Sequence, residues 1–228
     1  MEEQIIRPGD LVLYKDQQII ALNKPAGMPV QADQSGAKSL FDLAEIYAKK
    51  NLYLTNRLDR PVAGLVLFGK NAQAAAAIHQ QLQDRSLNKT YLAITGKKLP
   101  KDSGQLIHHI KKDGTKNRSL ALDNPDVDTQ EAILNYDLID ASDRYFLYKV
   151  ELLTGRHHQI RAQFGQMGCP IRGDEKYGFK RQNKDRSIDL FCWKMEFTHP
   201  TGGDRKLIEA PIPDLPLWNA FAEKIKSV

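Results

Sequence analysis

Cysteine and long apolar runs are scarce in this sequence. Only Cys169 and Cys192 occur among its 228 residues, and neither stands in a CxxC pair or at the spacing of metal ligands. We therefore expect both to be packing residues in a reducing compartment. No stretch approaches the roughly 18 apolar residues of a membrane span, and the polar segment Met1–Asp10 is unlike a secretory signal. These absences favour a cytoplasmic protein without a membrane partner.

Several common catalytic motifs are also missing. Thr95-Gly96-Lys97-Lys98 lacks the earlier glycine and the following Ser or Thr of a phosphate-binding loop, and no GxGxxG or GxSxG occurs. The pairs His108-His109 and His157-His158 are adjacent in sequence, so their side chains diverge on a helix or a strand. We therefore expect no metal site, no nucleotide cofactor and no hydrolase of the α/β type.

What is present is an ordinary globular composition. The chain is 41% hydrophobic, 27% charged and 8% aromatic, which excludes collagen-like, coiled-coil and disordered classes. Its length allows one large domain or two small ones.

Apolar runs predict strands, and helical spacing with capping residues predicts helices. The predicted strands are 19–22, 64–68, 90–95, 131–139, 145–153 and 190–197, and the predicted helices are 38–50, 71–85 (capped by Asn71), 155–167 (capped by Thr154) and 215–225. Strands outnumber helices without alternating with them, so an α+β fold with a largely antiparallel sheet is expected.

Positive charge is concentrated in one segment. The whole chain has a net charge of +5, but Arg85–Arg118 holds nine Lys or Arg against Asp102 and Asp113, a net charge of +7. Such a segment favours a polyanion such as RNA, because lysines and arginines that neutralise phosphates release counterions. A solvated surface loop explains the same charges, and the sequence leaves both interpretations open.

Two further segments can carry chemistry. Asn56-Arg57-Leu58-Asp59-Arg60 places an acid between two arginines, and neighbouring guanidinium groups keep a carboxylate ionised. Asp59 is therefore a candidate nucleophile or electrostatic stabiliser, although a plain surface ion pair explains the pattern too. In Thr154–Arg161, helical spacing would place His157 and His158 on the face of Arg161. This cationic edge suits a phosphate or a catalytic carboxylate.

Six motifs in order resemble the RluA family of RNA pseudouridine synthases. They comprise Leu22-Asn23-Lys24-Pro25-Ala26-Gly27-Met28-Pro29-Val30, residues 57–68 around Arg57-Leu58-Asp59-Arg60, Lys89-Thr90-Tyr91, Thr154–Arg161, residues 168–178 and Phe197-Thr198-His199-Pro200. The resemblance covers most of the chain. It begins near residue 20, so we expect a stand-alone catalytic domain over 1–228 without the RNA-binding S4 domain of many relatives.

The resemblance implies isomerisation of uridine to pseudouridine in structured RNA, by an enzyme without metal or organic cofactor. It implies a pseudouridine synthase fold, with helices flanking the mixed, largely antiparallel sheet and a central active-site cleft. Asp59 then corresponds to the catalytic carboxylate, Tyr91 to the residue stacked on the target base, and Arg161 to the partner of Asp59. Arg57 corresponds to the arginine that fills the gap left by the flipped uridine. Further substrate-binding positions are Arg60, Arg156, His158, Gln159 and Ile160.

The sequence departs from the family pattern at Asn56, Ala63, His157 and Gln163. These departures leave the subfamily and the RNA target open, and we expect a monomer that binds an rRNA or tRNA stem-loop. Two other functions remain as alternatives. One is an inactive RNA-binding protein with the same fold, which the presence of Asp59, Tyr91 and Arg161 disfavours. The other is a glycoside hydrolase with Asp59 as nucleophile, for which no partner acid stands at a recognisable motif.

Overall fold

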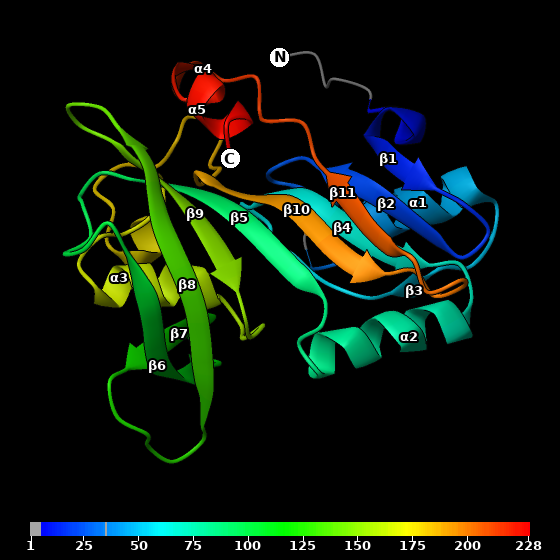
Figure 1. Ribbon diagram of the computed structural model, residues 1–228, viewed down its shortest axis with the longest axis horizontal. Helices are drawn as coiled ribbons and strands as arrows, with labels where there is room; N and C mark the ends of the chain where they lie inside the picture. The colour runs from blue at the N-terminus through cyan, green and yellow to red at the C-terminus, as the bar shows by residue number, and fades with distance from the viewer. Residues whose placement is uncertain (1–5, 35) are drawn as a thin grey trace. The chain divides into compact units, whose positions relative to one another are not determined.

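The structure is a computed structural model that describes residues 6–34 and 36–228. Its backbone divides into two compact units, each built from segments that are distant in sequence (Figure 1). The first comprises Met1–Leu87 with Lys194–Ala210, and the second comprises Asn88–Trp193 with Pro211–Val228. The single catalytic domain over 1–228 stays a prediction. Within the described residues, no helix is long and apolar enough to cross a membrane.

The first unit is built on antiparallel strands. Strand β2 (Ile19–Lys24) pairs with β1 (Val12–Lys15) and with β4 (Ala63–Gly69), and β4 also pairs with β3 (Tyr53–Leu54). Strand β11 (Arg205–Glu209) pairs with residues 194–198 of β10 (Leu190–Thr198). The apolar runs 19–22 and 65–68 are fully buried. The strands predicted at 19–22, 64–68 and 190–197 are therefore confirmed.

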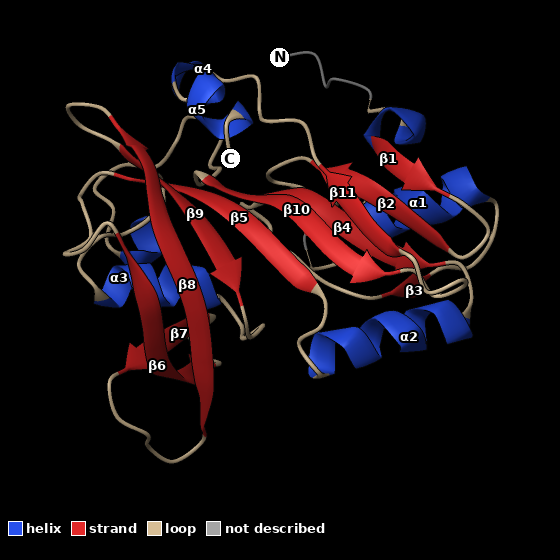
Figure 2. Ribbon diagram, in the orientation of Figure 1, coloured by secondary structure: helices blue, strands red, loops and turns tan. Residues whose placement is uncertain are grey.

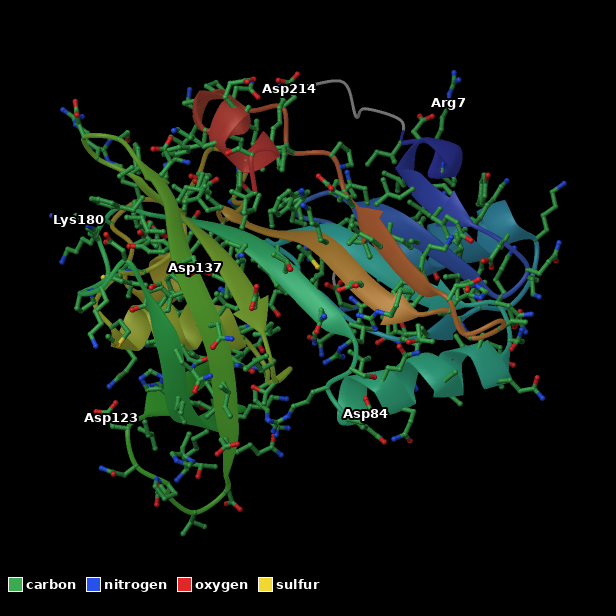
Figure 3. All side chains as sticks on the ribbon, in the orientation of Figure 1. Arg7, Asp84, Asp123, Asp137, Lys180 and Asp214 are labelled. Atoms are coloured by element: carbon green, nitrogen blue, oxygen red, sulfur yellow. The ribbon has the colours of Figure 1, made fainter. Side chains whose placement is uncertain are left out.

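Helices of the first unit begin at the capping residues that the sequence offers. A short 3-10 helix, η1 (Pro8–Leu11), precedes β1. Helix α1 (Leu40–Ala48) starts with a capping box between Ser39 and Asp42. Helix α2 (Ala72–Gln83) starts at Asn71, whose Oδ1 accepts a hydrogen bond from the Ala74 amide at 2.8 Å, and ends at Asp84 (Figure 3). Both predicted helices are confirmed, within two residues at each end.

The second unit holds a longer antiparallel series of strands (Figure 2). Strand β5 (Asn88–Thr95) pairs with β9 (Phe146–Leu152), β9 with β8 (Thr129–Ala141), β8 with β6 (Ser103–Asp113), and β6 with β7 (Arg118–Leu122). The three strands predicted within 90–153 are confirmed. Tyr136, Tyr148 and Phe164 pack edge to face with ring centroids 5.8 to 6.4 Å apart. Strands predominate in both units, which confirms the α+β fold with a mainly antiparallel sheet and flanking helices.

The basic segment Arg85–Arg118 is not a single loop, because most of its residues lie in strands β5 and β6. Five of its nine basic residues nevertheless lie outside the strands, namely Arg85, Lys97, Lys98, Lys101 and Lys116. Leu106, His108 and Ile110 alternate inward along β6 and are buried. Strand β6 forms a hairpin with β7, which ends just before Asp123 (Figure 3). The sequence does not show this alternation, because the polar His108 points inward while the apolar Ile107 is exposed.

Two predicted helices differ from the structure. The helix predicted over 215–225 is two short helices, α4 (Pro216–Ala220) and α5 (Ala222–Lys226), separated at Phe221. This break lets Trp218, Phe221 and Ile225 all be buried. The helix predicted over 155–167 is the shorter α3 (Gln159–Gln166), which packs on β6 and β7. A 3-10 helix, η2 (Glu175–Tyr177), follows it.

Candidate active site

Asp59 begins a tight turn, residues 59–62, at the end of the segment that connects β3 to β4 in the first unit. The Thr55 hydroxyl donates to the carbonyl of Leu67 at 2.6 Å, and the Leu67 amide donates to Asn56 Oδ1 at 2.9 Å. The Val62 amide donates to the Asp59 carbonyl at 3.0 Å and closes the turn. The turn is therefore fixed to β4, and Asp59 is part-exposed within it.

A buried lysine donates hydrogen bonds to the backbone of this turn and of a neighbouring segment. Lys24, at the end of β2, is completely buried, and its ammonium donates to the carbonyls of Arg60, Met28 and Pro25 at 3.1, 2.8 and 3.0 Å. Three acceptors match the three donors of a protonated lysine. The lysine thereby joins the residues around Asp59 to the segment that follows β2.

Arg60 strengthens the same junction. Its Nε donates to the Gly27 carbonyl at 2.8 Å, and the Gly27 amide donates to the Arg60 carbonyl at 2.8 Å. Gly27 has a φ of 83°, in the region that favours glycine. The exposed guanidinium also pairs with Asp33 at 3.3 Å. Arg60 therefore has a structural role in the turn, while Arg57 is exposed.

Lys24 and Asp59 are coupled electrostatically. Burial lowers the pKa of Lys24 to about 7, the charge of Asp59 opposes this change, and the charge of Arg60 adds to it. Lys24 belongs to a motif quoted above, but its role was missed. The signal was a lysine directly after a buried apolar strand and before a proline.

Tyr91 is positioned by β5 in the second unit. It pairs with Val150 of β9 in antiparallel register, and its side chain is buried. Lys89 precedes it by two residues in the same strand, so the two side chains lie on the same face. The predicted role of Tyr91 requires a ring held in one orientation, and a buried strand position provides this.

The segment 154–158 does not form the predicted helical turn. The Thr154 hydroxyl donates to Gln159 Oε1 at 2.8 Å, and the Arg156 amide donates to the same oxygen at 3.0 Å. The Gln159 carboxamide therefore holds this segment as a loop. Thr154 is not the cap, because α3 starts after His158, whose φ is 54°. The prediction that His157 and His158 share a helix face with Arg161 is wrong.

The two histidines instead stack on each other with centroids 3.8 Å apart. His157 Nδ1 is 2.9 Å from the Ser119 hydroxyl, and His158 Nδ1 is 3.0 Å from the Tyr177 hydroxyl. Tyr177 also accepts a hydrogen bond from the Ser119 amide at 2.8 Å. The residues 154–158 are thus fixed to β7 and η2.

Arg161 is buried in the second unit and oriented by Asp174. Its Nε and Nη2 donate to the two carboxylate oxygens of Asp174 at 2.7 and 2.9 Å. Both side chains are at most 5% exposed, and the guanidinium lies over the Tyr177 ring at 5.1 Å. Asp174 is thus a positioning residue that sequence reasoning did not single out. Pairing of Arg161 with Asp59 stays a prediction.

The remaining candidates are mostly engaged within the second unit. Arg156 Nε donates to the Glu131 carbonyl at 2.9 Å, and Gln159 Nε2 donates to the Ile133 carbonyl at 3.1 Å. Ile160 is buried. Their substrate contacts stay predictions. Across the described residues, His, Cys, Asp and Glu form no group of three or more that could hold a metal ion.

Comparison with known proteins points to one family. A family profile described as RNA pseudouridylate synthase matches residues 18–166. The chain is 30% identical over 231 residues to the uncharacterized RNA pseudouridine synthase MG209 homolog of Mycoplasma pneumoniae. The match covers 98% of this chain and 72% of that protein. It is 36% identical over 177 residues to ribosomal large subunit pseudouridine synthase C of Rickettsia bellii, over 74% of this chain and 57% of that protein. The solved structure of Human RNA Pseudouridylate Synthase Domain Containing 4 has a TM-score of 0.76 at 20% identity, over 96% of this chain and 95% of that one, a likeness of fold.

Proposed function

This chain belongs to the RNA pseudouridylate synthase family, of the RluA type, and we propose that Asp59 is its catalytic carboxylate. The enzyme is an isomerase that converts uridine to pseudouridine in RNA. The observation that carries the assignment of Asp59 is its place in a turn supported by Lys24, whose buried positive charge interacts with it. A rigid, part-exposed carboxylate beside a fixed cation suits a group that must act on a sugar carbon.

The chemistry explains why a carboxylate is needed. Breaking the bond between ribose C1′ and uracil N1 builds positive charge on the sugar, which an ionised Asp59 stabilises or captures. The detached uracil turns and forms a new bond from C5 to C1′. The C5 proton is then removed and N1 ends protonated, so no atom is gained or lost. A closed site retains the uracil during the turn.

Other residues have proposed roles in the same reaction. We propose that Tyr91 stacks on the uracil and receives the C5 proton, and that Arg161 pairs with Asp59. The uridine must flip out of the base stack, because its reacting atoms are shielded there. Arg57 is proposed to fill the place that the flipped uridine leaves. Arg60, Arg156, His158, Gln159 and Ile160 are proposed to contact the substrate. The fixed orientations of Tyr91 and Arg161 support these roles.

We propose a structured rRNA or tRNA stem-loop as the substrate, and a monomer as the active form. The named function of the Rickettsia relative, which concerns the large ribosomal subunit, supports rRNA as the first candidate. We also propose that the enzyme acts in the cytoplasm. Its two cysteines are both buried and are not joined in a disulfide, as expected in a reducing compartment.

Pseudouridine mapping of total RNA tests the function. RNA from a deletion strain is compared with RNA from its parent and from the strain complemented with the wild-type gene. We expect at least one uridine that is modified in the parent, unmodified in the deletion strain and restored on complementation. If every site is retained in the deletion strain, an inactive RNA-binding protein is the better description.

A further inference from the structure

Lys89 is a cation for which neither the fold nor the proposed chemistry has a use so far. It lies in β5 two residues before Tyr91, on the same face of the strand. Its side chain is part-exposed, and its Nζ packs against Gly155, where an added Cβ would lie only 3.3 Å away. The lysine therefore lies between the proposed base-stacking residue and the segment 154–158.

Lys89 lacks the carboxylate partners that two other lysines of its charged segment, Lys98 and Lys111, have. Lys98 pairs with Asp102 at 2.7 Å, and Lys111 pairs with Asp126 at 2.9 Å. Among the residues that the structure describes, Lys89 Nζ has no carboxylate and no hydrogen-bond acceptor. Burial lowers the pKa of Lys89, opposed only by the thiol of Cys192. A desolvated cation without a partner lowers the stability of the fold.

The surroundings of Lys89 reach the protein surface. Its side chain is part-exposed, and the neighbouring Gly155 is exposed and has no side chain that could cover Nζ. The next residue, Arg156, is anchored through Nε to the Glu131 carbonyl, which brings a second cationic side chain to the same segment. An anion bound here would restore to Lys89 the hydrogen bonds it lost on burial.

We propose that Lys89 and the backbone at Gly155 form a subsite for one phosphate group of the RNA, beside the nucleotide that is modified. The inference rests on the proposed function, because it takes Tyr91 to mark the position of the base. A phosphodiester is the anion that every nucleotide of the substrate carries. Such a contact positions the strand without reading its sequence.

Salt dependence of RNA binding tests this subsite. The probe is a fluorescein-labelled oligouridylate about 12 nucleotides long, since a single strand presents uridine without the cost of unpairing. Loss of one phosphate contact from a single strand reduces the slope of log affinity against log salt by about 0.7. We expect this reduction in Lys89→Met, with a roughly tenfold loss of affinity at low salt. Lys98→Met is the matched control, because Lys98 belongs to the same segment and is already paired.

Two measurements separate a binding role from a structural one. Removing an unpaired, partly desolvated cation should leave the melting temperature unchanged or raise it by up to about 4 °C, whereas removing a structural lysine lowers it. Lys89→Arg keeps the charge and should retain most of the salt slope. Gly155→Ala places a methyl group against Nζ and should weaken binding without unfolding the protein, since a flexible side chain can shift by tenths of an ångström.

An unchanged salt slope in Lys89→Met overturns the subsite, whatever the melting temperature does. If Lys89→Met does not fold, an unchanged affinity in Gly155→Ala overturns it as well. Failure of the proposed function is a separate result. In that case the wild-type enzyme itself restores no pseudouridine to the RNA of the deletion strain.

Discussion

At the scale of single residues, Asp59 carries the strongest prediction. Asp59→Asn should abolish isomerisation, because the amide cannot stabilise or capture the positive charge on the sugar. The fold should persist, since the turn is held by Lys24, Asn56 and backbone contacts in which the Asp59 side chain takes no part. Single-turnover assays on RNA from the deletion strain measure the rate. Turnover within about tenfold of wild type, or about 1.4 kcal/mol of barrier, would contradict the assignment.

A test of Arg161 requires a double variant, because Arg161 also neutralises the buried carboxylate of Asp174. Arg161→Met leaves the carboxylate of Asp174, which is 1% exposed, without its partner, and breaking a buried pair costs roughly 3–5 kcal/mol of stability. The double variant Arg161→Met/Asp174→Leu removes both charges and should recover much of that stability. We expect its rate to stay at least a hundredfold below wild type, or about 2.7 kcal/mol of barrier. Denaturant melts and single-turnover rates test this, and recovery of activity with stability would give Arg161 a purely structural role.

Lys24 predicts a pH dependence of stability. Its folded pKa of about 7 lies below the usual value near 10.4, so between these pH values the unfolded chain binds the extra proton. Above about pH 10.4 Lys24 is neutral in both states and its charge costs the fold nothing. As the pH falls toward 7, protonation of the unfolded chain lowers the unfolding free energy. From pH 7 to 9 the unfolding free energy of wild type should gain about 2 kcal/mol relative to Lys24→Met. Urea melts at several pH values measure this difference, and a constant difference would show that Lys24 keeps its proton throughout.

At the scale of elements, the β6–β7 hairpin is the best candidate to follow the RNA backbone. Lys112 and Lys116 are exposed on it, whereas Lys111 is paired with Asp126. Replacing Lys112 and Lys116 by Gln should weaken the binding of target and non-target RNA by similar factors. It should also reduce the slope of log affinity against log salt by up to about 0.7 per lysine for a single strand. Lys111→Gln is the internal control and should have a smaller effect. Single-turnover rates at saturating RNA should barely change, and a salt slope equal to wild type would show that the hairpin is only solvated surface.

Elements with local signals were predictable from the sequence, and those fixed by distant contacts were not. Asn71 marks the start of α2 because its own side chain caps the helix. The start of α3 was placed too early, because Thr154 is drawn to Gln159 and to the Ile133 amide of a distant strand. Strand β6 was missed because the polar His108 points inward while its apolar neighbour Ile107 is exposed. In each failure a tertiary contact outweighed the local preference.

At the scale of the whole molecule, the candidate site could be predicted only through the family resemblance. Asp59 belongs to the first unit, while Tyr91 and Arg161 belong to the second, and no local pattern relates residues so far apart. The supporting groups escaped prediction for a physical reason. A buried charge such as Lys24 or Asp174 is tolerated only with partners that folding brings to it, and the sequence does not name those partners.

The division of the chain has a consequence for its synthesis. The first unit needs residues 194–210, and its N-terminal part ends at Leu87. At about 5–20 residues per second, the ribosome takes on the order of 5–20 s to make the roughly 100 residues in between. During that interval the N-terminal part lacks both β11 and the residues of β10 that pair with it. Nascent chains should therefore recruit chaperones until translation is nearly finished.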